Sequence, residues 1–303
     1  ATLPTFGNNE DAVLRILAAS KPLPLDKLNL SEKNIALFSE IIQKPYGIFL
    51  VVGPTGSGKT TTLHSALGHI NKPNKKIWTA EDPVEITQPG LRQVQIRSSI
   101  DLTFANALRA FLRADPDVIM IGEMRDRETV GMGVEASLTG HLVFSTLHTN
   151  SASETVIRLI DLGVDPFSFA DALLGILAQR LVKTLCSNCK EKYTPSSREI
   201  EVFKKEVGPE FWGELERVLS QKQICRPKGC PKCHQTGFKG RTGLHEMLTV
   251  SEELRHCIQN KGTSDEIRKI AVAEGMRTLK QDGILKVLMG YTTIEKVRTV
   301  CSI

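Results

Sequence analysis

The chain has 303 residues, of which 41% are hydrophobic and 24% are charged, a composition that excludes disordered, collagen-like and coiled-coil proteins. Its 39 Lys and Arg against 34 Asp and Glu give a net charge of +5, a milder excess than a dedicated nucleic-acid binder carries. The longest apolar stretches, such as Ile48–Val52, are far shorter than the roughly 18 residues of a membrane span, so we expect a soluble fold.

The N-terminal segment Thr2–Ala19 is too short to fold alone, and the stretch Lys21–Leu28, with two prolines, is typical of a linker. Ala1–Glu10 carries neither the basic start nor the apolar core of a signal peptide, and the sequence does not begin with Met. We therefore expect a piece of a longer chain, in which residues 1–28 are the tail of a preceding domain and a linker.

From Ile48 to Val182 short apolar runs alternate with helical patterns, which favours an α/β fold built on a parallel sheet. Four runs are apolar almost throughout, as expected of strands covered on both faces: Ile48–Val52, Ile77–Ala80, Val118–Gly122 and His141–Thr146. Apolar residues at helical spacing predict helices near residues 63–70 and 104–112. Ser151 and Glu154 form a capping-box pattern that opens another helix, which Gly163 closes.

The first apolar run is followed at once by a glycine-rich segment with the pattern G-x-x-x-x-G-K-[ST], which also opens a helix. Its backbone N–H groups suit phosphates, Lys59 can reach the β- and γ-phosphates, and the Thr60 hydroxyl suits Mg²⁺. The predicted nucleotide-binding residues are Gly53, Pro54, Thr55, Gly56, Ser57, Gly58, Lys59, Thr60 and Thr61. The alternative is a glycine-rich turn that binds nothing.

A nucleotide hydrolase also needs an acidic group near the metal and a group that orients water. The segment Asp117–Glu123 is an apolar strand that ends in a carboxylate, which resembles a Walker B element with Glu in the usual Asp place. Glu81 follows another apolar run, where a second carboxylate could polarise the attacking water. Either glutamate alone could be a solvated acid at a strand end, but together with the phosphate loop they favour hydrolysis.

Two histidines flank the strand expected at Leu142–Leu147. His148 follows its carboxyl end, the side on which ligands bind open α/β sheets, so we predict that His148 contacts the γ-phosphate. For His141 a phosphate contact and a structural role at the strand end are equally compatible with the pattern.

Cys186-x-x-Cys189 and Cys230-x-x-Cys233 form two pairs separated by 40 residues. Four thiolates at about 2.3 Å in a closed tetrahedron suit structural zinc and leave no open catalytic position. The alternative is that the cysteines form disulfides. The phosphate loop argues against disulfides, because a P-loop ATPase works where thiols stay reduced. Cys225 is close in sequence and could be a spare ligand, whereas the other two cysteines resemble ordinary thiols.

Between the cysteine pairs a charged stretch, Ser197–Ser220, is expected to be helical, and Leu244–Ile303 is expected to form small helices. We therefore divide the chain into an ATPase core at residues 29–184, a tetracysteine zinc subdomain at 185–243 and a C-terminal helical subdomain at 244–303.

These motifs, in this order and spacing, resemble those of the secretion ATPases that power type II secretion and type IV pilus assembly. Four boxes carry the resemblance: the Walker A loop, an Asp box at Glu81–Glu85, the Walker B strand ending at Glu123 and a His box at Gly140–Asn150. The resemblance extends from Thr2–Thr5 to Gly290–Glu295. One departure is visible, because Ser98 and Ser99 stand where a Pro followed by a basic residue is common in the family.

The resemblance implies a RecA-like ATPase domain in a homohexameric ring, with ATP and Mg²⁺ bound beside a preceding PAS-like domain. It implies a cytoplasmic motor that works on an inner-membrane platform without spanning the membrane itself. By resemblance Glu81 is the catalytic base, Glu123 is the Mg²⁺-associated acid, and Arg15 reaches the γ-phosphate from the preceding domain. Arg109 and Arg113 match family arginines, with salt bridges on a helix face as the alternative.

The tetracysteine module implies an extension motor rather than a retraction motor, while type II secretion and pilus assembly are not separated by the sequence. Two other functions stay open. A RecA-like nucleic-acid motor is disfavoured by the 5% aromatic content and the near-balanced charge. A nucleotide-binding protein that does not hydrolyse ATP is disfavoured by the two carboxylates.

Overall fold

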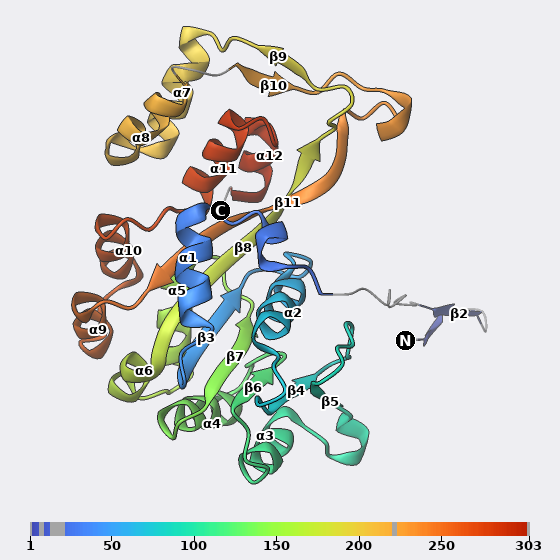
Figure 1. The fold of residues 1–303 in the computed structure, drawn as a ribbon, viewed down its shortest axis with the longest axis vertical. Helices are drawn as coiled ribbons and strands as arrows, with labels where there is room; N and C mark the ends of the chain where they lie inside the picture. Colours follow the sequence, from blue (N-terminus) through green and yellow to red (C-terminus); the bar gives the residue numbers. More distant parts are fainter. Residues whose placement is uncertain (1, 6–8, 13–21, 220–222, 302–303) are drawn as a thin grey trace.

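The computed structural model describes residues 2–5, 9–12, 22–219 and 223–301, and a seven-stranded sheet lies at the centre of this part of the chain (Figure 1). The strand order is β11-β8-β3-β7-β6-β4-β5. The strands are β3 (Gly47–Val52), β4 (Ile77–Glu81), β5 (Arg92–Gln95), β6 (Val118–Ile121), β7 (Leu142–Leu147), β8 (Leu173–Leu185) and β11 (Phe238–Thr249). All adjacent pairs are parallel except β11 with β8, so the expected parallel sheet is confirmed for six strands and the whole sheet is mixed.

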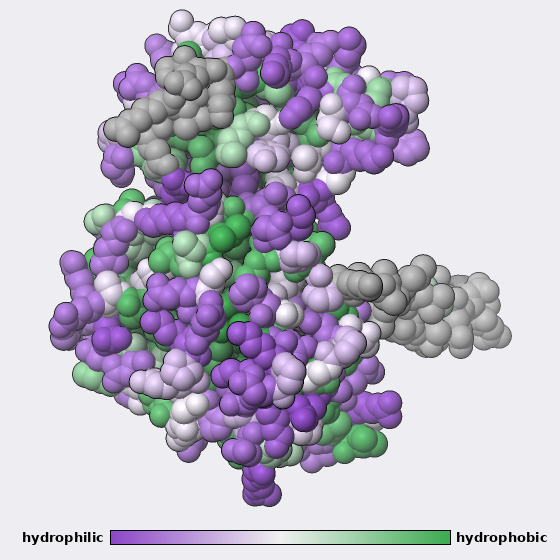
Figure 2. All heavy atoms as spheres, viewed as in Figure 1, coloured by the Kyte–Doolittle hydropathy of each residue, from purple (hydrophilic) through white to green (hydrophobic). Residues whose placement is uncertain are grey.

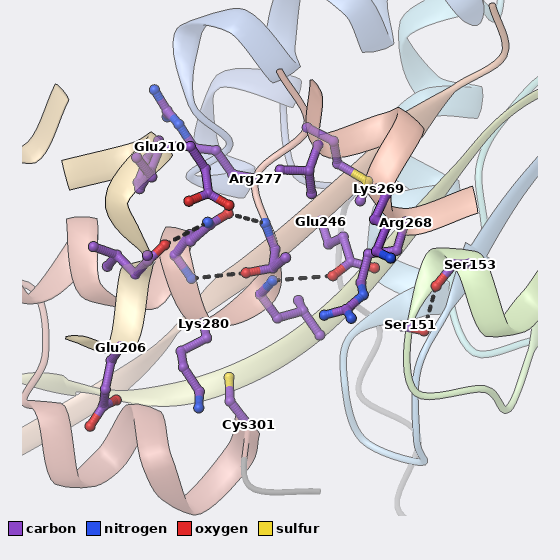
Figure 3. Close-up of a pocket in the computed structure, with 18 of the residues that line it drawn as sticks. Ser151, Ser153, Glu206, Glu210, Glu246, Arg268, Lys269, Arg277, Lys280 and Cys301 are labelled. Carbon is purple, nitrogen blue, oxygen red and sulfur yellow. Dashed lines mark hydrogen bonds between the residues drawn. The ribbon is translucent and has the colours of Figure 1, made fainter. Parts of the chain in front are cut away.

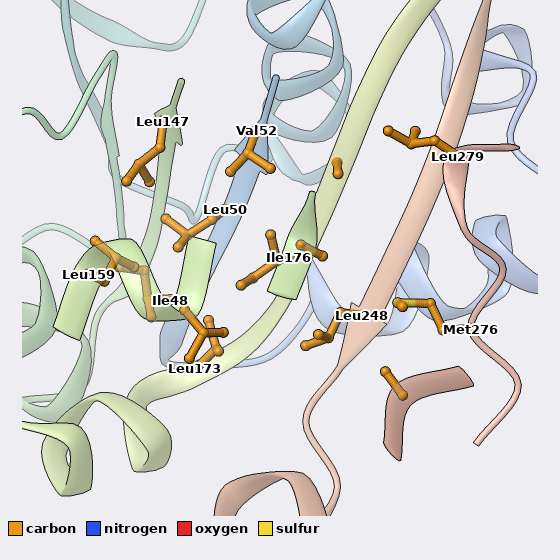
Figure 4. Close-up of a cluster of buried hydrophobic side chains, with 14 of the residues drawn as sticks. Ile48, Leu50, Val52, Leu147, Leu159, Leu173, Ile176, Leu248, Met276 and Leu279 are labelled. Carbon is orange, nitrogen blue, oxygen red and sulfur yellow. The ribbon is translucent and has the colours of Figure 1, made fainter. Parts of the chain in front are cut away.

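The four predicted strands match β3, β4, β6 and β7. The interior strand β3 illustrates why such strands are apolar almost throughout. Ile48, Leu50 and Val52 belong to the hydrophobic cluster on one face of the sheet, and Figure 4 shows them beside residues of β7 and β8. Phe49 and Val51 belong to the cluster on the other face. Because successive side chains of a strand point to opposite faces, covering both faces removes the alternation of polar and apolar residues.

Helices cover both faces of the sheet. Helices α1 (Glu32–Ile41) and α2 (Lys59–Ile70) pack on one face together with the short 3-10 turn at Leu25–Leu28. Four helices contribute to the cluster on the opposite face: α3 (Phe104–Leu112), α4 (Arg127–Leu138), α5 (Ala152–Asp161) and α6 (Pro166–Ala172). The α5 prediction is confirmed, since Ser151 accepts from the backbone N–H of Glu154 and Gly163 follows the helix with φ 87°.

The long strands β8 and β11 run on from the sheet to the segment that carries the two cysteine pairs (Figure 1). This segment contains a small hairpin of β9 (Glu191–Tyr193) with β10 (Ile224–Arg226) and the 3-10 turn Pro231–Cys233. The expected helical stretch is divided into α7 (Ser197–Val207) and α8 (Pro209–Leu219). The division falls at Gly208, which takes φ 84°, because proline follows it and offers no N–H to continue a helix.

Four helices follow β11, namely α9 (Glu252–Gln259), α10 (Ser264–Ala273), α11 (Leu279–Leu288) and α12 (Ile294–Cys301). The prediction that Leu244–Ile303 forms helices is wrong for Leu244–Thr249, because these residues form the end of β11. Residues 242–248 are buried without alternation and pair with a strand 60 to 72 positions earlier, so no local pattern marks them as a strand. The division of the chain into subdomains stays a prediction.

Near the N-terminus β1 (Thr2–Thr5) and β2 (Asn9–Ala12) form an antiparallel hairpin, and the PAS-like origin of this segment stays a prediction. None of the helices in the described ranges combines the length and the apolar character that crossing a membrane requires. Hydrophilic residues cover most of the face seen in Figure 2.

Candidate nucleotide-binding site

The glycine-rich segment connects the end of β3 to the start of α2, as the sequence predicts. Gly58 precedes the helix with φ 89°, a conformation that favours glycine, and a Cβ at Gly53 would lie 2.4 Å from the carbonyl oxygen of Gln179. Gly58 is therefore required by its backbone conformation, and Gly53 by the close approach of Gln179.

The side chains of this loop are arranged for an anion. Lys59 Nζ donates to the carbonyl oxygens of Gly53 (2.7 Å) and Pro54 (3.1 Å), which places the ammonium over the loop. Burial lowers the pKa of Lys59, the negative charge of Glu123 opposes this shift, and Arg180 adds to it. Ser57 Oγ is buried without a hydrogen-bond partner among the described residues. A buried, unpartnered hydroxyl and a buried ammonium at a helix N-terminus fit a phosphate group.

Strand β8, which pairs with β3, fixes the phosphate loop and the start of α2 by hydrogen bonds. Gln179 Nε2 donates to the carbonyl oxygen of Ser57 (2.7 Å), and its Oε1 accepts from the Thr62 hydroxyl (2.7 Å). The next residue, Arg180, donates to the backbone and side-chain oxygens of Asn150, which lies two residues after His148. Adjacent residues of one strand therefore fix both the phosphate loop and the loop that follows β7.

Glu81 lies at the carboxyl end of β4, and only 3% of its surface is exposed. Its Oε1 accepts from Thr79 (2.6 Å) and Gln93 (3.0 Å), and its Oε2 lies 3.0 Å from His64 Nε2. Burial alone would raise the pKa of Glu81, but the hydrogen bonds from His64, Thr79 and Gln93 outweigh it and hold the pKa below its usual value. The carboxylate is therefore ionised and firmly oriented.

Glu123 lies just beyond the end of β6 and is the second carboxylate of the site. Its side chain is 16% exposed, pairs with Arg125 (2.6 Å) and lies 3.1 Å from His148 Nε2. Two predicted site residues, Glu123 and His148, are thus brought together, because β6 and β7 are adjacent parallel strands that end at the same edge.

A pocket of about 530 Å³ joins these groups. Its lining includes the phosphate loop from Thr55 to Thr61 and residues from the Asp, Walker B and His boxes, namely Glu81, Asp82, Glu85, Glu123 and His148. Arg125 and Arg241 also line it, and neither was singled out from the sequence. Arg241 lies on β11, where no local motif indicates that it reaches a nucleotide pocket.

His141 lies elsewhere. It precedes β7, whose six residues span about 20 Å, so it is at the opposite edge of the sheet from His148. Its Nδ1 lies 2.9 Å from the carbonyl oxygen of Ala136 near the end of α4. A γ-phosphate contact in the pocket of its own chain is therefore wrong, and the structural alternative is supported.

Three expected arginines have different outcomes. Arg15 lies outside the described residues. Arg109 pairs with Glu128 and donates to Asn106, which supports the helix-face salt bridge that the sequence left as an alternative. Arg113 is exposed.

The cysteine pairs converge as predicted. The Sγ atoms of Cys186, Cys189, Cys230 and Cys233 all lie within 4.8 Å of one another. The separations are 3.9 Å for Cys186–Cys230, 3.8 Å for Cys189–Cys233 and 3.7 Å for Cys230–Cys233. A tetrahedron with metal–sulfur bonds of about 2.3 Å places sulfur atoms about 3.8 Å apart, whereas a disulfide needs about 2.05 Å. The cluster therefore fits a metal ion, and all seven cysteines are free thiols.

Two backbone N–H groups point at this cluster. Although burial opposes it, donation from the backbone N–H groups of Cys230 and Gly237 lowers the pKa of Cys233, whereas burial raises the pKa of the neighbouring Cys189. Such stabilisation of a thiolate is typical of metal-binding cysteines. Cys225 is outside the cluster, on β10 beside Gly290, so it is not a spare ligand in this arrangement.

A larger cavity of about 1430 Å³ lies away from the phosphate loop, between α5, α7, α10 and α11 (Figure 3). Its buried acid, Glu246, accepts from the backbone N–H groups of Ala152 (2.8 Å) and Leu279 (3.3 Å). Burial raises the pKa of Glu246, and these two hydrogen bonds oppose the shift. Each oxygen of Glu246 accepts one backbone hydrogen bond, so this side chain joins β11 to the starts of α5 and α11.

The fold and the pocket define an α/β protein with a P-loop nucleotide site and a tetracysteine cluster. A family model described as "Type II/IV secretion system protein" matches residues 1–299, and the chain belongs to this family.

Curated relatives of two kinds are similar to the chain. The type IV pilus assembly ATPase PilB of Thermus thermophilus is 45% identical over 298 residues, which is 98% of this chain and 32% of that protein. The type II secretion system protein E of Pseudomonas aeruginosa is 44% identical over 301 residues, which is 99% of this chain and 57% of that protein. The chain thus spans about a third to three fifths of these relatives.

Among solved structures, the pilus retraction motor PilT with bound ADP has a TM-score of 0.65 and 29% identity, covering 94% of this chain and 68% of that one. The Legionella pneumophila ATPase DotB has a TM-score of 0.65 and 25% identity, covering 94% of this chain and 66% of that one.

Proposed function

We propose that the chain is the ATP-hydrolysing part of a motor that powers type II protein secretion or type IV pilus assembly. The observation that carries the proposal is the meeting of the phosphate loop, two strand-end carboxylates and His148 in one pocket. Two further findings support it. The relatives above are named for these two processes at nearly equal identity, and PilT was solved with ADP.

ATP would bind with its phosphates at the N-terminus of α2. The ammonium of Lys59 would exchange the carbonyls of Gly53 and Pro54 for phosphate oxygens, and Ser57 Oγ would gain the partner that it lacks. The Thr60 hydroxyl and Glu123 would hold Mg²⁺, which when bound neutralises charge that develops on the phosphates. His148, 43% exposed and beside Glu123, would contact the γ-phosphate.

Glu81 would orient and activate the attacking water. It lines the pocket as an ionised carboxylate, and its lowered pKa makes it a weak base that acts mainly by accepting a hydrogen bond and fixing the water's position. Positioning and electrostatics dominate phosphoryl transfer, so a firmly oriented carboxylate suits this role.

The working assembly in this proposal is a homohexameric ring on the cytoplasmic side of an inner-membrane platform, with a RecA-like core. Arg15 would reach the γ-phosphate from the PAS-like segment when the site closes, as the family resemblance implies. We further propose that the four cysteines bind one structural zinc ion, because their spacing matches a closed tetrathiolate shell.

The proposal is tested by phosphate release from ATP with Mg²⁺, with and without single-stranded DNA. Lys59→Ala should abolish turnover because no other described ammonium lines the pocket, whereas Lys44→Ala, which removes an exposed lysine paired with Glu40, should not. Nucleotide binding without turnover in the assembled wild-type protein would favour a non-hydrolysing protein. Stimulation by DNA would favour a nucleic-acid motor.

A further inference from the structure

The ring of His64 connects the phosphate-loop helix to Glu81. His64 lies on α2, five residues after Lys59, and is fully buried. Its Nε2 lies 3.0 Å from Glu81 Oε2, and its Nδ1 lies 2.7 Å from Gln88 Nε2. Gln88 Nε2 also donates to the backbone oxygen of His64 (2.9 Å).

The direction of each hydrogen bond follows from the donors and acceptors present. The ionised carboxylate of Glu81 can only accept, so His64 Nε2 carries the proton and donates it. The Gln88 amide donates one proton to the His64 carbonyl and the other to Nδ1, which must therefore be the acceptor. The contacts thus fit a neutral ring in a single tautomer, with every polar atom of its side chain satisfied.

The same network holds the segment that follows the Asp box. Gln93, which donates to Glu81, also donates to the carbonyl oxygen of Ile86 (2.8 Å) and accepts from the backbone N–H of Gln88 (2.8 Å). The loop that follows Glu81 is therefore fastened both to β5 and, through His64, to the helix that begins at the phosphate site.

The distribution of donors over the two oxygens of Glu81 singles out His64. An ionised carboxylate offers about four acceptor positions. Thr79 and Gln93 occupy both positions on Oε1, whereas Oε2 accepts from His64. The position left for a water molecule is therefore on Oε2, the oxygen that His64 holds.

We propose that His64 is a positioning residue for ATP hydrolysis: by donating to Glu81 Oε2 it fixes the carboxylate oxygen that receives the attacking water. This inference rests on the proposed role of Glu81. Because Lys59, Thr60 and His64 share one helix, the groups that meet the phosphates and the group that aims the carboxylate move together. His64 is fully buried and is not among the residues that line the pocket, so it acts through Glu81.

Two variants of matched chemistry test this. In His64→Gln the amide nitrogen comes near the place of Nε2 and can still donate to Glu81. In His64→Asn the shorter amide comes near Nδ1, faces Gln88 and leaves Oε2 without its donor. We expect kcat for ATP hydrolysis to fall about 10- to 100-fold in His64→Asn, the usual effect of a misplaced catalytic group, with the Kd of ATP changed less than about threefold. His64→Gln should turn over at least about tenfold faster than His64→Asn.

Adding His64→Asn to the Glu81→Gln variant distinguishes a positioning role of His64 from a packing role. There His64→Asn should cause little further loss of kcat, because two residues that act through one interaction are not additive. Loss of ATP affinity in parallel with kcat in both His64 variants, or a full additive loss beside Glu81→Gln, would show a packing role and overturn the proposal. Wild-type kcat in His64→Asn together with a slow Glu81→Gln would overturn it while leaving the proposed function intact. Wild-type kcat in Glu81→Gln would remove the role of Glu81 and this inference with it.

Discussion

Glu81 and Glu123 end neighbouring strands but have different surroundings. Glu81 is almost fully buried and held by three neutral donors, whereas Glu123 is partly exposed and lies between Arg125 and His148. A rigid, buried carboxylate suits the orientation of one water molecule, and a more exposed carboxylate suits a hydrated metal ion that enters with ATP.

The two roles predict different losses in the Gln variants. Glu81→Gln should slow hydrolysis by about 10² to 10⁴ while the Kd of ATP with Mg²⁺ stays close to that of the wild type. Glu123→Gln should weaken ATP binding only when Mg²⁺ is present, because the lost group belongs to the metal. Binding titrations with Mg²⁺ and with excess chelator, combined with single-turnover rates, separate the two. The opposite pattern would exchange the roles.

The hydrogen bonds to Glu81 also predict a dependence of stability on pH. Its pKa in the folded protein is below the usual 4.5, so its interactions stabilise the fold above pH 4.5 and lose this effect as the pH falls through the folded value. The difference in free energy of unfolding between wild type and Glu81→Gln, measured in urea, should be constant from pH 8 to 6 and shrink below about pH 4.5. A difference that grows on acidification would contradict the ionised, hydrogen-bonded state.

At the scale of elements, β8 joins three parts of the molecule. Gln179 holds the phosphate loop, Arg180 holds the loop after β7, and the strand ends one residue before Cys186. Its partner β11 leads back from Cys233 through Gly237, so the four-cysteine cluster lies at the end of this strand pair.

Replacing one thiolate should therefore affect this end of the molecule first. Protein purified without chelator should contain about one zinc per chain, and Cys186→Ser should lose most of it and melt at least about 5 °C lower. Cys257→Ser is the matched control, because Cys257 lies on α9 outside the cluster, and its zinc content should equal that of the wild type. Absence of metal together with thiols that react only after reduction would instead support disulfides.

At the scale of the whole molecule, the pocket lies where β4, β6 and β7 end, and Arg15, which the family resemblance assigns to it, lies outside the described residues. In the proposed ring, closure over ATP supplies Arg15, and the contact forms chiefly in the transition state.

Arg15→Ala should therefore lower kcat by about 10³ or more, with a much smaller change in the Kd of ATP. Lys27→Ala is a suitable control, since Lys27 is an exposed cation paired only with the adjacent Asp26 among the described contacts. Specific activity of the wild type should rise with protein concentration as rings form. A flat concentration profile with equal rates for wild type and Arg15→Ala would exclude the ring mechanism for this chain.

The sequence alone determined the features that depend on neighbouring residues. Strands buried on both faces, the phosphate loop before α2 and the paired cysteines each have a signature within about ten residues, because hydrophobic periodicity, backbone conformation and ligand spacing act over short distances. The sequence also indicates that Glu81, Glu123 and His148 lie at one edge of the sheet, because parallel strands bring their carboxyl ends to the same edge whatever their order along the chain.

Contacts between side chains that are far apart in the sequence follow from the tertiary structure. His64 and Glu81 are 17 residues apart, Thr62 and Gln179 are 117 apart, and Ser57 and Gln179 are 122 apart, and no local pattern encodes these contacts. The same holds for β11, whose buried residues lack alternation, and for Arg241, which it carries to the pocket. The role of His141 is ambiguous in the sequence because its sequence neighbours resemble those of a site residue. The direction of β7 places His141 at the edge of the sheet opposite His148. Long-range pairing decides these positions because burial and hydrogen bonding depend on neighbours that only folding brings together.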